Sequence, residues 1–184
     1  MTSTTSLRCL GPPRIEREGA SPPRPVAPDN QPIELLLRVA AAGPGGASAT
    51  MLCAAMWPHV APEARRNALR AAMRRLDRCL AVRQALVLDG NRVVVNRGAL
   101  DVDSLDLEAA IAPLLNPFSI ATPVECTRAR EALAGISARH SAEFLLDIQE
   151  PWAVQARLRI ADAVRRAPLS FHLHEKSRRT ETTT

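Results

Sequence analysis

Residues 63–80 (EARRNALRAAMRRLDRCL) constrain the fold most, because they form an amphipathic helix with one apolar face. Apolar side chains recur there at i, i+4, i+7 and i+11, a spacing that places them on one side of a 3.6-residue helix. These side chains are Leu69, Met73, Leu76 and Leu80. At about 100° per residue, a second group falls within an arc of roughly 100° on the opposite side. This second group is Asn67, Arg70, Ala71, Arg74 and Arg78. The helix therefore has a side that packs on a core and a cationic side rich in hydrogen-bond donors.

The cationic side has two interpretations. In the DNA major groove, arginine donates paired hydrogen bonds to guanine, asparagine pairs with adenine, and both contact phosphates. Arginine is also common on the solvent-exposed side of ordinary surface helices. It is the main basic residue of this chain, whose single lysine is Lys176. The helix alone leaves both interpretations open.

Charge is unevenly distributed along the chain. Residues 62–100 hold nine arginines against three acidic residues, a local net charge of +6. Residues 101–125 hold five acidic residues and no basic one, a net charge of −5, while the whole chain of 184 residues has a net charge of +5. Positive charge concentrated around one helix favours a polyanionic partner.

Two further helices are predicted before the arginine-rich one. Pro32 suits a first helical turn, and the glycine-rich residues 43–46 end that helix. Ser48 is a suitable N-cap for a short second helix, which a turn between Pro58 and Pro62 joins to the third. The residues expected to face inward are Ile33, Leu36, Leu37 and Ala40 in the first helix, and Leu52, Ala55 and Met56 in the second. This order of elements is typical of a helix-turn-helix unit.

A β-hairpin is predicted directly after the third helix. Residues 85–88 (ALVL) and 92–95 (RVVV) are aliphatic or β-branched, and Asp89-Gly90-Asn91 joins them. An Asp-Gly pair between two such runs is a strong hairpin signal, because glycine tolerates the positive φ of the turn. A hairpin at 85–96 that follows a helix-turn-helix unit is a wing. Its flanking arginines are interpreted either as contacts to phosphates or the minor groove, or as solvated charges on an edge strand: Arg83, Arg92 and Arg97.

These elements predict a fold that is mainly α with a small β component: a winged helix-turn-helix followed by a short helical extension. We expect a disordered arm at residues 1–30, the winged-helix domain at 31–103, the helical extension at 104–167, and a disordered tail at 168–184. Within the extension, residues 126–167 are expected to be helical, with partial apolar stripes at Leu133, Ile136, His140, Phe144 and Leu145 and at Trp152, Ala156, Ile160 and Val164. Trp152 is interpreted as the core of a two-helix unit or as an anchor of a dimer interface.

Several classes of protein are not indicated. No apolar run approaches the roughly 20 residues of a membrane span, and the proline-rich start lacks the core of a signal peptide, so we expect a cytoplasmic bacterial protein. The four scattered cysteines indicate neither a disulfide framework nor a zinc site, and His172 with His174 is a weak metal pattern. We expect no cofactor, no metal and no catalytic residues, because residues 43–46 lack the following lysine of a phosphate-binding loop and no nucleophile is paired with a base.

Four groups of residues match the pattern of a known family. The first two are Leu52, Met56, Trp57 and Pro58, and then Arg66, Asn67, Leu69, Arg70, Arg75, Leu76 and Leu80. The others are Val102, Asp103, Leu107 and Glu108, and then Phe144, Leu145, residues 150–153 (EPWA) and Arg157. Together they resemble SARP-type transcriptional regulators, in which an OmpR-like winged helix precedes a bacterial transcriptional activator domain. The resemblance covers roughly residues 31–167. Asp77 stands where the family usually has arginine, Leu107 where it has an aromatic residue, and the activator domain is truncated compared with the family.

The resemblance implies a sequence-specific regulator of transcription, an activator, that binds double-stranded DNA. Its third helix would read the major groove, its wing would contact the adjacent minor groove, and homodimers would bind direct repeats. The turn at residues 58–62 is either a contact to RNA polymerase or a rigid connector. The candidate DNA-binding residues are Arg65, Arg66, Asn67, Arg70, Arg74, Arg75, Arg78 and Arg92. Base contacts are assigned mainly to Asn67, Arg70 and Arg74, and phosphate contacts to the other arginines. The alternative is a winged helix that binds proteins and not DNA.

Overall fold

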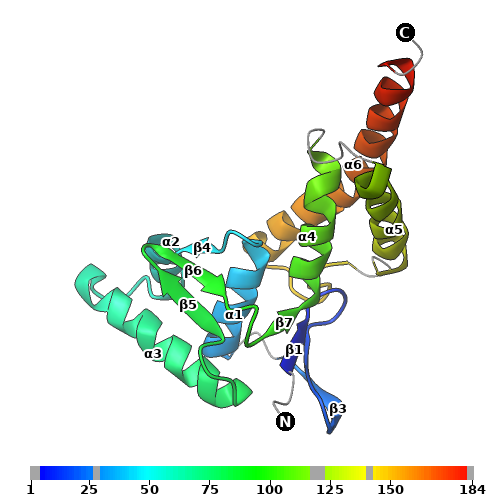
Figure 1. Ribbon diagram of the computed structural model, residues 1–184. Coiled ribbons are helices and arrows are strands. Elements are labelled where there is room, and N and C mark those ends of the chain that lie inside the picture. The colour runs from blue at the N-terminus through cyan, green and yellow to red at the C-terminus, as the bar shows by residue number, and fades with distance from the viewer. Residues whose placement is uncertain (1–4, 27–29, 117–122, 140–142, 182–184) are drawn as a thin grey trace.

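The computed structural model describes residues 5–26, 30–116, 123–139 and 143–181. In this part of the chain, two small sheets lie on opposite sides of one central helix, and further helices extend away from them (Figure 1). The strand order is β3-β2-β1-β7 in one sheet and β4-β6-β5 in the other. The predicted fold class, mainly α with a small β component, is confirmed.

The first sheet is built mainly from the N-terminal residues. Strands β1 (Thr5–Arg8), β2 (Arg14–Arg17) and β3 (Ala20–Pro25) form an antiparallel meander, and β7 (Asp101–Val102) adds to β1 in parallel. The prediction that residues 1–30 are a disordered arm is therefore wrong for the described residues 5–26.

Contacts with distant parts of the chain explain why this sheet forms. Leu7 and Cys9 are fully buried. The Asp103 carboxylate accepts hydrogen bonds from the backbone amides of Cys9 at 2.7 Å and Leu10 at 3.2 Å. Strand β1 thus has partners more than 90 positions away, in β7 and Asp103, in addition to its local neighbour β2. A prediction from local composition cannot include these distant contacts.

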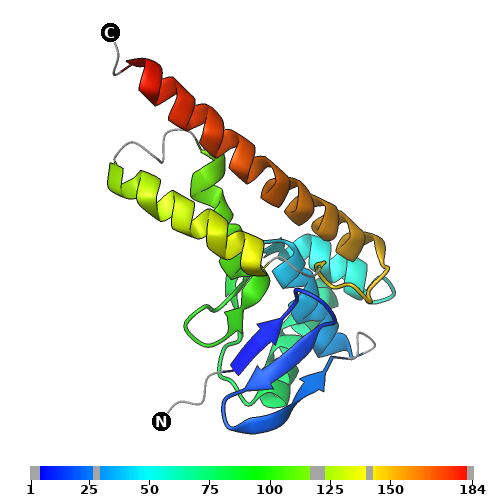
Figure 2. The ribbon, with the colours of Figure 1, turned by 90° about the vertical axis from the view of Figure 1, so that its right-hand side faces the viewer.

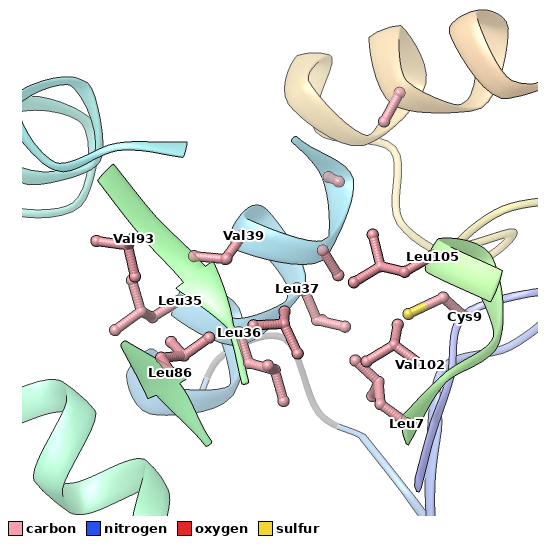
Figure 3. Packing of buried hydrophobic residues seen from close by; sticks show 14 of the residues in the cluster. Leu7, Cys9, Leu35, Leu36, Leu37, Val39, Leu86, Val93, Val102 and Leu105 are labelled. Carbon is pink, nitrogen blue, oxygen red and sulfur yellow. The ribbon is translucent and has the colours of Figure 1, made fainter. Parts of the chain in front are cut away.

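Helix α1 (Gln31–Ala41) lies between the two sheets. Figure 3 shows Leu35 pointing towards Val93 of the second sheet, while Leu37 points towards Val102 and Leu105. Seven of its eleven residues are buried. The predicted inward residues are among them, but burial on both sides makes α1 a central helix, not one covered on a single face.

The winged helix-turn-helix is present as predicted. Helix α2 (Ala49–Met56) is capped by Ser48, whose Oγ accepts from the Met51 amide at 3.4 Å, and α3 is Pro62–Leu80. Strand β4 (Ala47–Ser48) pairs with β6 (Arg92–Val95), which pairs with β5 (Leu86–Asp89) in the expected hairpin. Gly90 has the positive φ of the turn, +56°. One expectation was wrong: Ala55 is exposed, because α2 packs through Leu52 and Cys53 instead.

Three helices form the C-terminal extension (Figure 2): α4 (Asp103–Leu115), α5 (Pro123–Arg139) and α6 (Pro151–Glu181). Residues 143–150 between α5 and α6 are not helical, so the prediction of helix throughout 126–167 is wrong there. The prediction of a disordered tail at 168–184 is also wrong up to Glu181. Helix α6 continues through Pro168, where a helix loses one backbone hydrogen bond but need not end. His140 lies outside the described residues.

The segment between α5 and α6 attaches the extension to the first sheet. The amide of Gly11 donates to the Glu143 carbonyl at 2.8 Å, and that of Leu145 donates to the Cys9 carbonyl at 2.7 Å. Phe144 and Leu145 are fully buried, so they serve the core of this junction and not a helical stripe.

Side chains of α6 complete this attachment. Arg157 donates to four backbone carbonyls of the segment: Phe144, Leu145, Leu146 and Ile148. Arg159 pairs with Glu108 of α4 and donates to the Ala41 carbonyl at the end of α1. Trp152 is half-buried, and the Arg38 guanidinium lies 4.9 Å from its ring centroid, which supports its interpretation as a packing residue of the chain. No helix among the described residues is long and apolar enough to cross a membrane.

Candidate nucleic-acid interface

Helix α3 separates its apolar and cationic residues as predicted. Its buried residues are Leu69, Ala72, Leu76 and Leu80, and Met73 is half-buried beside them. The predicted polar face is exposed at Asn67, Arg70, Arg74 and Arg78, and Arg75 is exposed as well. Helix α3 lies on the outside of the winged helix, on the side away from α5 and α6 (Figure 1). The extension therefore leaves this face uncovered.

The arginines of the exposed face have no partner among the described residues. Arg70, Arg74, Arg75 and Arg78 make neither hydrogen bonds nor ion pairs through their guanidinium groups there, and neither does Arg83 just beyond the helix. Several arginines elsewhere in the described part of the chain form ion pairs with carboxylates, among them Arg8, Arg97 and Arg159. The α3 face thus holds a local excess of positive charge that suits a polyanion.

The other predicted DNA-binding arginines hydrogen-bond to backbone carbonyls. Arg65 donates to Val60 at 2.8 Å and to Pro58 at 3.0 Å, across the turn before α3. Arg66 donates to the Gly90 carbonyl in the wing turn, and Arg92 donates to the carbonyls of residues 45 and 46 in the loop before β4. The structure thus divides the eight candidates into an outward group on α3 and a group of three bound to the protein's own backbone.

The arginines flanking the wing also differ from one another. Arg97 forms ion pairs with Asp101 and Asp106, which favours a role within the protein over a contact with DNA phosphates. Arg83 is exposed. Arg92 is exposed as well, but its guanidinium is bound to the loop before β4. Of these three, Arg83 keeps the free cation that a phosphate contact needs.

Asp77 has a structural role that sequence reasoning missed. In the sequence, Asp77 stands out only as a departure from the arginine usual at this position in SARP-type regulators. In the structure, its carboxylate accepts hydrogen bonds from the amides of Gln84 at 3.1 Å and Ala85 at 3.0 Å. The loop there is strained, because Ala81 and Gln84 have positive φ values of 48° and 55°. Asp77 therefore fixes the connection between α3 and the wing.

Replacement of Asp77 by alanine is expected to lower the free energy of unfolding by about 1–3 kcal/mol, because the amides of Gln84 and Ala85 lose a charged acceptor. Urea denaturation measures this loss. The matched control is Asp89→Ala, at an exposed position of the wing, which is expected to change stability by less than about 0.5 kcal/mol. Equal losses in the two variants would contradict the role of Asp77.

Two of the described cysteines, Cys9 and Cys53, are buried. Burial raises the pKa of the Cys9 thiol well above its usual value, and burial also raises that of Cys53. Thiols of this kind are inert, because the thiolate is the nucleophile. Among the described residues, no group of three or more histidine, cysteine, aspartate or glutamate side chains is placed to hold a metal ion.

Comparisons with known proteins bear on the fold. No protein-family model matches the sequence, and no curated protein matches it. A solved structure, Mycobacterium tuberculosis EmbR in complex with a low-affinity phosphopeptide, is similar to this chain with a TM-score of 0.50 and 16% sequence identity. The likeness is one of fold. It covers 91% of this chain and 46% of that one, so this chain spans less than half the length of the EmbR chain.

The residues that carried the family resemblance beyond the wing have physical roles in the structure. Val102 and Leu107 are buried in the core, and Asp103 binds the amides at the end of β1. Glu108 pairs with Arg159 of α6. These residues connect the winged helix to its extension, a role that the sequence pattern alone does not show.

Proposed function

We propose that this protein is a sequence-specific, double-stranded DNA-binding transcription regulator that uses α3 as its recognition helix. The observation that carries the proposal is the exposed face of α3, where Asn67 is exposed and the guanidinium groups of Arg70, Arg74 and Arg78 have no described partner. An α-helix fits the major groove, and these side chains supply the donors that base edges and phosphates accept. The resemblance to SARP-type regulators and the fold likeness to EmbR support the same function.

The arrangement suggests a division of roles on this face. Asn67, Arg70 and Arg74 follow one another at steps of three and four residues along the middle of the exposed face, so they would meet the floor of the groove together. We assign base contacts to them. Arg75 and Arg78 extend the cationic surface, and Arg83 continues it past the end of the helix, which suits contacts with the phosphate backbone.

Other features implied by the resemblance remain predictions. They are activation of transcription, dimers on direct repeats, and a contact between residues 58–62 and RNA polymerase. Pro58 and His59 are exposed, while Arg65 fixes the carbonyls of the turn, so its surface is both accessible and rigid. Both interpretations of this turn, a polymerase contact and a connector, are compatible with that geometry.

Selection of DNA from a library of random duplexes tests the proposed function without a known operator. The full chain should enrich one recurring motif, with half-sites about 10–11 base pairs apart if it binds as a dimer on one face of the DNA. A matched variant with Arg70, Arg74 and Arg78 replaced by glutamine keeps the fold and should enrich no motif. A wild-type protein that retains no DNA in this selection would refute the proposal and favour a protein-binding winged helix.

A further inference from the structure

Two arginines hold the turn of the wing against the rest of the winged helix. Arg66 of α3 donates from Nη2 to the Gly90 carbonyl at 2.9 Å. Arg92, on the other side of the turn, donates from Nε to the Gly45 carbonyl at 2.5 Å and from Nη2 to the Gly46 carbonyl at 2.6 Å. The turn is thereby tied to the recognition helix and to the loop that precedes β4.

The remaining residue of the turn is bound as well. The carbonyl of Asn91 accepts from the Ala49 amide at 2.8 Å, and its side chain Oδ1 accepts from the Thr50 hydroxyl at 3.1 Å. Both partners lie in the first turn of α2. Three elements therefore hold the tip of a hairpin that would be marginally stable alone.

The loop before β4 is shaped for this contact. Gly46 has a φ of +67°, and a Cβ atom at this position would lie 2.3 Å from the Val93 carbonyl oxygen. The close approach allows the carbonyls of residues 45 and 46 to face Arg92. A planar guanidinium can donate to two such oxygens at once, whereas an ammonium group lacks this fixed fork.

We propose that Arg66 and Arg92 are positioning residues of the DNA-binding surface, which fix the wing relative to the arginine face of α3 and do not themselves neutralise phosphates. The inference rests on the proposed function, because the geometry that they maintain is that of the DNA-binding unit. A wing fixed in advance does not have to be ordered when DNA binds, so its rigidity raises affinity without a contact of its own.

Amide hydrogen exchange in the free protein tests whether Arg66 and Arg92 hold the wing turn in place, and it requires no DNA. In Arg66→Ala and Arg92→Ala, the amides of β5 and β6 should exchange about five- to tenfold faster than in the wild type, because each variant loses hydrogen bonds that hold the turn. Arg92→Lys should also exchange faster, since it keeps the charge but loses the fork. The control is Arg75→Ala on α3, for which the wing should exchange as in the wild type. Unchanged exchange in the Arg66 and Arg92 variants would overturn the proposal.

The salt dependence of binding to a random-sequence duplex then separates positioning from phosphate contact. Arg92→Ala and Arg66→Ala should weaken binding about two- to tenfold while leaving the slope of log affinity against log salt unchanged. Arg78→Ala, which removes an exposed arginine assigned to the phosphate backbone, is the comparison, and loss of its phosphate contact should make that slope shallower by about 0.9. A slope made shallower by Arg92→Ala and restored by Arg92→Lys would overturn the proposal. If the wild-type protein shows no salt-dependent binding, the proposed function fails. The exchange experiment still decides whether Arg66 and Arg92 hold the wing turn in place.

Discussion

Replacing Arg70 or Arg74 with alanine is expected to weaken binding to the selected DNA site by about 1–3 kcal/mol each, and to relax the base preference at the positions that they read. Both side chains are exposed on the middle of the cationic face of α3, and neither guanidinium has a described partner. Their removal therefore leaves the fold intact and deletes paired donors to base edges. Titration of each variant with the selected duplex and with a random duplex measures the effect.

The comparison between the two duplexes decides the role of these arginines. A residue that reads a base should lose more affinity on the selected site than on random DNA. Equal losses on both would remove the base-reading role and leave a phosphate contact. Arg165→Ala is the matched control, since it removes one exposed arginine of α6, a helix that extends away from α3 (Figure 1), and it should alter neither affinity by much.

Replacing Leu7 with alanine is expected to lower the free energy of unfolding by about 2–5 kcal/mol, as is usual for a fully buried leucine. Leu7 lies in β1 and faces the core beneath α1, close to Val102 (Figure 3). The loss tests directly whether the N-terminal residues are part of the folded unit. Urea denaturation of the full chain, followed by circular dichroism, measures it.

The matched control is Leu158→Ala, because Leu158 is 65% exposed on α6. A change of less than about 0.5 kcal/mol is expected there. If Leu7→Ala were as mild as this control, the N-terminal residues would behave as the disordered arm that composition suggests, and the first sheet would be refuted.

Elements with strong local signals could be predicted from the sequence. The period of leucines in α3 and the Asp89-Gly90 turn of the wing are properties of short segments, and the structure confirms both. The N-terminal sheet could not be found in this way. Its three N-terminal strands are four to six residues long, and β1 gains its second neighbour from β7, nearly a hundred residues later. Such pairing leaves no local periodicity.

The roles of individual charged residues could not be predicted from the sequence either. Arg66 and Arg70 are both exposed arginines of one helix, yet Arg66 donates to a wing carbonyl and Arg70 has no described partner. Asp77 seemed unsuited to a cationic helix, and the structure shows that it binds two amides of the following loop. Composition indicates that a surface is cationic, but only the geometry shows which guanidinium groups are free to bind a ligand.

The salt dependence of DNA binding by the wild-type chain tests the central claim most directly, because it counts the phosphates that the protein neutralises. The free arginines on α3 and just after it are Arg70, Arg74, Arg75, Arg78 and Arg83. If about five phosphates are engaged, log affinity for a random duplex should fall with log salt at a slope of roughly −4 to −5. A slope near zero, or no binding at low salt, would contradict the assignment of the α3 face to DNA.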